Sequence, residues 1–144
     1  MATYQMSLLT PQPAAQVFDY LARFSNAVEW DPGVVSGRAM QDGPLRLGST
    51  FRLGVRFARR SLELEYEVID LVPGSRVVLR AENSLVRSTD TITVSPVPDG
   101  GAQVGYHAVL EPTKARLLLG PLLAWSFRRT GERARAGLEA KLAG

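Results

Sequence analysis

The chain has 144 residues, 45% of them hydrophobic and 22% charged, and its formal net charge at pH 7 is +3. This length and composition predict a single globular domain over residues 1–144 and exclude a disordered or collagen-like chain. Because the sequence contains no Cys, it offers no disulfide, thiolate nucleophile or thiolate metal site. The N-terminus, MATYQMSLLT, lacks the basic segment and long apolar stretch of a signal peptide, so we expect a cytoplasmic protein.

The positive charge comes almost entirely from arginine, since Lys114 and Lys141 are the only lysines. In the strand-like runs, arginines and glutamates both occupy alternate positions: Arg52, Arg56, Arg76 and Arg80 beside Glu63, Glu65, Glu67 and Glu82. Such a mixed-sign pattern is typical of a solvated face, whereas a track for phosphates needs clustered cations. We therefore expect no nucleic-acid partner.

The N-terminal part of the chain predicts one strand and two helical segments. Polar and apolar residues alternate over 3–10, as in a strand with one buried face. Thr10 and Pro11 then supply an N-cap and a first helical residue. A stripe with helical spacing follows, made of Ala14, Val17, Phe18 and Leu21. A shorter helical segment, 24–30, must end before Pro32, because proline disfavours helix in the residue that precedes it.

Five or six strand-like runs follow, separated by turn signals such as VPGSR and VPDGG. The clearest runs are 49–57, 61–71, 77–83, 88–96 and 102–112. The first two read as an antiparallel pair whose outer faces carry opposite charges. On the last two, alternation predicts that Asp90, Ile92 and Val94 point inward. Tyr106 joins them on the inner face, which leaves His107 outside.

From about Pro112 the apolar residues adopt helical spacing as far as the C-terminus. The predicted buried stripe consists of Leu123, Phe127, Ala134, Leu138 and Leu142. Pro121 follows Gly120 and cannot donate a backbone hydrogen bond, so it must break or restart this helix. An antiparallel sheet needs a cover for its apolar face, and only this helix has enough apolar surface. The prediction is an α+β fold in which a curved antiparallel sheet of about seven strands wraps around the C-terminal helix.

Two short motifs lie at the entry to this fold, Phe18-Asp19-Tyr20-Leu21 and Trp30-Asp31-Pro32. With the order of the elements, they resemble the START-like helix-grip superfamily (SRPBCC), in particular its polyketide cyclase/dehydrase-type members. The resemblance covers essentially the whole chain and implies a sheet around an apolar cavity, with two short helices after the first strand. Its motifs mark the fold rather than a reaction, since the superfamily includes lipid carriers, cyclases and hydrolase-like enzymes.

The segment Glu29-Trp30-Asp31 places a tryptophan between two carboxylates, and we interpret it as a joint between a helix and a strand. Carboxylates two residues apart on a helix do not face one another, which argues against a catalytic pair. Trp30 then anchors the short helix on the sheet, and Asp31 begins an Asp-Pro turn. Trp30 is also expected to form part of the cavity wall.

The inward faces offer few polar groups that could act on a bound molecule. The catalytic candidates are Asp90, Tyr66 and Tyr106. The predicted ligand-binding residues are Trp30, Phe51, Phe57, Tyr66, Asn83, Tyr106 and Phe127. Asp90 is either a strand-end residue in water or a pocket carboxylate with Arg87 as its partner, and the tyrosines either pack in the core or line the pocket. His107 is the only histidine, so we expect no metal site, no histidine base and no cofactor.

Two functions from different classes fit this pattern. The first is the binding of a small hydrophobic ligand, such as a lipid, a quinone or a polyketide-like aromatic, in a cavity between the sheet and the C-terminal helix. The second is a polyketide cyclase/aromatase that promotes aldol cyclisation and dehydration, which requires an acid/base pair deep in the pocket. The inward faces are rich in aliphatic residues and poor in paired titratable groups, which favours binding.

A second apolar stripe on the C-terminal helix, formed by Leu118, Leu122 and Trp125, has the spacing i, i+4 and i+7. A contiguous apolar patch of this kind needs a cover. It predicts either the interface of a homodimer or a lid over the mouth of the cavity. The surrounding run LLLGPLLAWSF is too short to span a bilayer and is interrupted by proline, so no stable membrane insertion is expected.

Overall fold

The computed structural model describes residues 2–57, 59–84, 86–113 and 120–143, and their side chains except those of residues 57 and 120–130. In chain order the elements are β1 (Ala2–Thr10), α1 (Ala14–Ala22), the 3-10 turn η1 (Phe24–Asn26), α2 (Ala27–Trp30), β2 (Val34–Ala39), β3 (Thr50–Phe57), β4 (Arg60–Val72), β5 (Arg76–Glu82), β6 (Val86–Pro96), β7 (Ala102–Pro112) and α3 (Gly120–Leu142). The predicted order of a strand, two short helices, an antiparallel meander and a C-terminal helix is confirmed.

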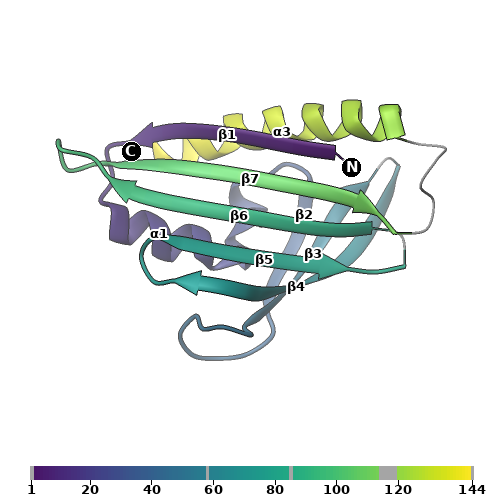
Figure 1. The fold of residues 1–144 in the computed structure, drawn as a ribbon, viewed down its shortest axis with the longest axis horizontal. Helices are drawn as coiled ribbons and strands as arrows, with labels where there is room; N and C mark the ends of the chain where they lie inside the picture. The colour runs from purple at the N-terminus through teal and green to yellow at the C-terminus, as the bar shows by residue number, and fades with distance from the viewer. Residues whose placement is uncertain (1, 58, 85, 114–119, 144) are drawn as a thin grey trace.

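The strands form one seven-stranded antiparallel sheet with the order β1-β7-β6-β5-β4-β3-β2. Strands that follow one another in the chain are neighbours from β2 to β7, and β1 pairs with β7 at the far edge. The sheet curls, so that β2 and β3 lie behind the front strands in Figure 1, while α3 runs along β1. The predicted sheet wrapped around a C-terminal helix is confirmed.

Alternation along the strands separates a buried inner face from a solvated outer face. Every second residue of β1, from Ala2 to Thr10, is buried. Ile92 is completely buried, and Asp90 is only 6% exposed, whereas His107 is exposed as predicted. On the outer face, the Arg52 Nε atom lies 3.0 Å from Glu63 Oε1, which confirms the opposite charges predicted for β3 and β4.

Helix α1 begins three residues later than the sequence indicated. It starts at Ala14, and its N-cap residue is Pro13 rather than Thr10. Thr10 is instead the last residue of β1, where its hydroxyl accepts a hydrogen bond from the Gln12 backbone and donates to the Leu142 carbonyl at 2.6 Å. The prediction of a Thr10 cap was wrong because this side chain ties β1 to the end of α3.

Helix α3 is fixed in place by two glycines. A Cβ atom on Gly131 would lie 2.4 Å from the ring of Tyr4 on β1, and one on Gly137 would lie 1.9 Å from the carbonyl oxygen of Trp30. Only glycine therefore permits this close approach of α3 to β1 and α2. The buried side chains of α3 include Ala134, Leu138 and Leu142, which confirms that part of the predicted stripe.

In the described part of the chain α3 runs from Gly120, with Pro121 in its first turn, and the predicted break before it stays a prediction because residues 114–119 lie outside the described part. The side chains of Leu122, Leu123, Trp125 and Phe127 lie outside the described part of the chain, as does all of Leu118. The interface or lid formed by Leu118, Leu122 and Trp125 therefore stays a prediction. Among the described residues, no helix is long and apolar enough to cross a membrane.

Candidate functional site

A chain of buried hydrogen bonds crosses the inner face of the sheet. The Tyr66 hydroxyl donates to Ser88 Oγ at 2.9 Å, and Ser88 Oγ donates to Asp90 Oδ1 at 3.0 Å. Tyr106 donates its hydroxyl proton to the other carboxylate oxygen, Asp90 Oδ2. Three of the four side chains are at most 6% exposed, and Tyr106 is partly exposed. The structure thus brings together the three catalytic candidates, Asp90, Tyr66 and Tyr106, and adds Ser88 to them.

Strand register explains how these side chains meet. Ser88 on β6 pairs with Ala81 on β5, and Tyr66 on β4 stands on the other side of Ala81. Because Ala81 carries only a methyl group, the phenol of Tyr66 reaches across β5 to Ser88. Asp90 is the next inner-face residue of β6, and Tyr106 approaches it diagonally from β7. The chain of hydrogen bonds therefore depends on four adjacent strands.

Burial governs the protonation of this network. It raises the pKa of Asp90 to about 6, while the hydrogen bonds from Tyr106 and Ser88 act in the opposite direction. Burial, followed by the nearby charge of Asp90, raises the pKa values of Tyr66 and Tyr106 well above the ordinary value of 10.0. At neutral pH the two phenols are therefore hydrogen-bond donors, and Asp90 is an acceptor close to its own titration range.

Asp31 supplies a second carboxyl group to the same region. It ends α2, where its Oδ1 atom accepts a hydrogen bond of 2.8 Å from the Gly33 backbone, so the predicted turn is present. Burial raises the pKa of Asp31 to about 6, and the charge of Asp90 raises it further. Glu29 points elsewhere, because it accepts a hydrogen bond of 2.7 Å from the Tyr20 hydroxyl. The two carboxylates of the motif do not face each other, but Asp31 is electrostatically coupled to Asp90.

Trp30 joins this site to the helical layer. Its side chain is 3% exposed, and its ring meets that of Tyr106 edge-on, with centroids 5.7 Å apart. The predicted anchoring of α2 by Trp30 is confirmed. Its indole Nε1 atom is buried and has no hydrogen-bond partner among the residues that the structure describes. A buried N–H group without a partner is rare and unfavourable, which makes this donor a feature that requires an explanation.

The other predicted ligand-binding residues have varied positions. Phe51 is 1% exposed and belongs to the core cluster. Asn83 is half-buried, and its Oδ1 atom accepts a hydrogen bond of 2.9 Å from the Val86 backbone at the β5–β6 turn. The side chains of Phe57 and Phe127 lie outside the described part of the chain.

Two predictions about Asp90 were wrong. It is not a strand-end residue in water, since β6 begins at Val86 and Asp90 is buried in its interior. Arg87 is not its partner, because Arg87 Nε lies 2.9 Å from Glu82 Oε2 on the outer face. Residues three apart on a strand point to opposite faces, so Arg87 and Asp90 cannot meet.

Sequence reasoning missed Ser88 and Asp31 as members of the site. Ser88 is two residues before Asp90 in the same predicted strand, so alternation alone places them on one face. Asp31 had a weaker signal, its place after a tryptophan expected in the cavity wall. Its approach to Asp90 depends on the docking of α2 and carries no local pattern in the sequence.

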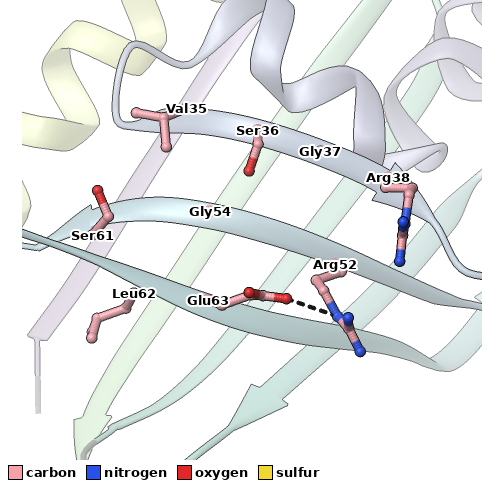
Figure 2. Close-up of a pocket in the computed structure, with 9 residues that line it drawn as sticks. All are labelled: Val35, Ser36, Gly37, Arg38, Arg52, Gly54, Ser61, Leu62 and Glu63. Carbon is pink, nitrogen blue, oxygen red and sulfur yellow. Dashed lines mark ion pairs between the residues drawn. The ribbon is translucent and has the colours of Figure 1, made fainter.

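A separate groove of about 530 Å³ lies on the outer face of β2, β3 and β4. Figure 2 shows Ser36, Gly54 and Glu63 on the three neighbouring strands, with the ion pair between Arg52 and Glu63 at one side. A Cβ atom on Gly54 would lie 2.5 Å from Ser36 Oγ, so the missing side chain helps to form the hollow. None of the predicted site residues lines this groove.

A curled antiparallel sheet with a C-terminal helix and two short helices after the first strand defines the START-like helix-grip class of proteins. The family model described as "Polyketide cyclase / dehydrase and lipid transport" matches residues 1–143. The chain belongs to this family. No curated protein sequence matches it at a significant level.

Solved structures agree with this assignment at the level of the fold. A START superfamily protein from Mycobacterium smegmatis is 13% identical with a TM-score of 0.79, over 99% of this chain and 97% of the other. A protein from Thermus thermophilus is 16% identical with a TM-score of 0.76, over 97% and 96% of the two chains. The di-domain ARO/CYC BexL from the BE-7585A biosynthetic pathway is 20% identical with a TM-score of 0.68, over 99% of this chain and 45% of that one.

Proposed function

We propose that the protein binds a small hydrophobic ligand, such as a lipid, a quinone or a polyketide-like aromatic, in a cavity between the sheet and α3. The observation that carries the proposal is Tyr106, whose side chain projects from the inner face, remains partly exposed and bonds to the buried Asp90. Val55 and Leu62, also on the inner face, are partly exposed as well. Apolar surface around a few orienting polar groups is typical of small-molecule sites.

The proposal is tested by displacement of an apolar fluorescent dye with fatty alcohols, quinones and flat aromatics. Val55→Trp adds a ring on the inner face and lies outside the outer groove, so it should weaken dye binding at least tenfold by filling the space that the ligand needs. Ser61→Trp is the matched control: Ser61 pairs with Arg56, the chain neighbour of Val55, and points to the outer face, so this variant should leave binding unchanged. Circular dichroism verifies that both variants fold.

The proposal fails if no compound of the panel displaces the dye. It also fails if Ser61→Trp weakens binding while Val55→Trp does not, since the dye would then occupy the outer groove that Ser61 lines and Val55 does not.

A polyketide cyclase/aromatase activity is the second candidate, and a specific observation favours it. Asp31 and Asp90 both have pKa values of about 6 and lie close enough to influence each other. Carboxyl groups that titrate near neutral pH serve as either proton donor or proton acceptor, which aldol condensation and dehydration require. The test is product formation from a poly-ketone substrate, with Asp90→Asn expected to abolish turnover. Turnover that persists in Asp90→Asn would contradict a role for this carboxylate.

A further inference from the structure

The hydroxyl groups of the hydrogen-bond network at Asp90 all donate to other members of the network. Tyr66 donates to Ser88, while Ser88 and Tyr106 both donate to Asp90, so every hydroxyl proton of the network is in use. The phenol, hydroxyl and carboxylate oxygens can each still accept a hydrogen bond, so the network offers a ligand only acceptors. The network is therefore matched to a group that donates.

Two carboxyl groups, those of Asp31 and Asp90, lie close enough for the charge of Asp90 to raise the pKa of Asp31. No ion pair involves Asp31 or Asp90 among the described residues, and the nearby charge that acts on Asp31 is the like charge of Asp90. A third carboxylate brought in by a ligand would add repulsion in a buried place where water screens poorly. The electrostatics thus disfavour an anionic ligand such as a fatty acid.

Trp30 provides the complementary group. Its Nε1 donor is buried without a partner in the described part of the chain, and its ring stands against Tyr106, the residue that bonds to Asp90. A buried N–H group without a partner lowers the stability of the fold unless a bound molecule supplies an acceptor. The region around Tyr106 therefore combines one donor without a described partner, the Trp30 N–H, with the acceptor oxygens of the Asp90 network.

We propose that this site recognises a neutral hydroxyl group, an alcohol or a phenol, at the polar end of an otherwise hydrophobic ligand, and discriminates against a carboxylate on the same skeleton. The inference rests on the proposed function. A hydroxyl is the smallest group that both donates to a carboxyl oxygen and accepts from the Trp30 N–H. A carboxylate accepts but does not donate, and an ammonium donates but does not accept.

The experiment measures dye displacement at pH 8 by 1-decanol, decanoate, decylammonium and methyl decyl ether. These compounds carry unbranched alkyl chains that differ by one carbon at most, so the polar end is the main difference between them. Decanol should bind at least tenfold more tightly than decanoate, and about tenfold more tightly than the ether, which lacks the donor. If decanoate or decylammonium binds as tightly as decanol, the inference is wrong while the proposed function stands. If none of the four displaces the dye while a quinone or a flat aromatic does, the inference is wrong and the proposed function stands; if those also fail to displace it, the proposed function itself fails.

Two variants test whether Trp30 and Asp90 cause the preference for the alcohol. Trp30→Phe keeps a ring against Tyr106 but removes the N–H, so decanol should lose several fold of its advantage over decylammonium, the one compound of the set that cannot accept this hydrogen bond. Asp90→Asn removes one charge, so the decanoate penalty should shrink. Selectivity unchanged in both variants would overturn the assignment, and Ser61→Trp on the outer face serves as the control that should preserve it.

Discussion

Asp90→Asn should stabilise the protein at pH 8 although it replaces a buried, hydrogen-bonded residue. Asp90 has a folded-state pKa of about 6 against an ordinary value of 3.8. This difference corresponds to about 3 kcal/mol of folding free energy that the wild type loses when the carboxyl group ionises. Asparagine is nearly isosteric, accepts from Tyr106 through its carbonyl and donates to Ser88 through its amide. We therefore expect a gain of about 2 to 3 kcal/mol at pH 8.

The sign of the pH dependence follows from linkage. Between pH 4 and 6 the folded state holds a proton on Asp90 that the unfolded chain has released, so wild-type stability falls as pH rises. Below pH 4 both states are protonated, and above pH 7 both are ionised, so the contribution of Asp90 is then constant. Asp31, whose pKa is also raised to about 6, contributes with the same sign and remains in the variant.

The assay is urea unfolding at pH 4 to 8, followed by circular dichroism. The difference between Asp90→Asn and wild type should be near zero at pH 4 and should grow to its full size by pH 7. Asp19→Asn is the matched control: this carboxylate is exposed on α1, so its replacement should change stability by less than about 0.5 kcal/mol at every pH. A variant that is less stable than wild type at pH 8, or a difference that does not depend on pH, would refute the reasoning.

Three further substitutions test the packing around the site by urea unfolding at pH 7. Gly137→Ala should destabilise the protein by about 1 to 3 kcal/mol, because its Cβ would lie 1.9 Å from the Trp30 carbonyl oxygen. Helix propensity alone predicts a gain in stability, so a more stable variant would contradict the close contact. Thr10→Val should cost about 1 to 2 kcal/mol by removing the buried hydrogen bond to the Leu142 carbonyl, and an unchanged stability would show that water replaces it. Ser88→Ala should cost about 1 to 3 kcal/mol, since it interrupts the buried chain of hydrogen bonds in the middle, and a neutral effect would argue against that chain.

Alternation in the sequence predicted which face of the sheet each candidate occupies. It placed Asp90, Ile92 and Val94 inside and His107 outside, and all four positions agree with the structure. The same rule would have excluded Arg87 as the partner of Asp90, had residues 86 and 87 been recognised as the start of β6 rather than as part of a turn. The error was in the boundary of an element, which local patterns define less well than its type.

The sequence by itself determined the fold class, the inner faces of the strands and the buried stripe of α3 from Ala134 onward, because these depend on periods of two and 3.6 residues that apolar side chains display directly. Only the tertiary structure decided that Tyr106 bonds to Asp90 and that Asp31 approaches both. Those contacts depend on strand register and on the docking of α2 against α3 at Gly137. They join residues far apart in the chain, and no spacing in the sequence encodes the distance between them.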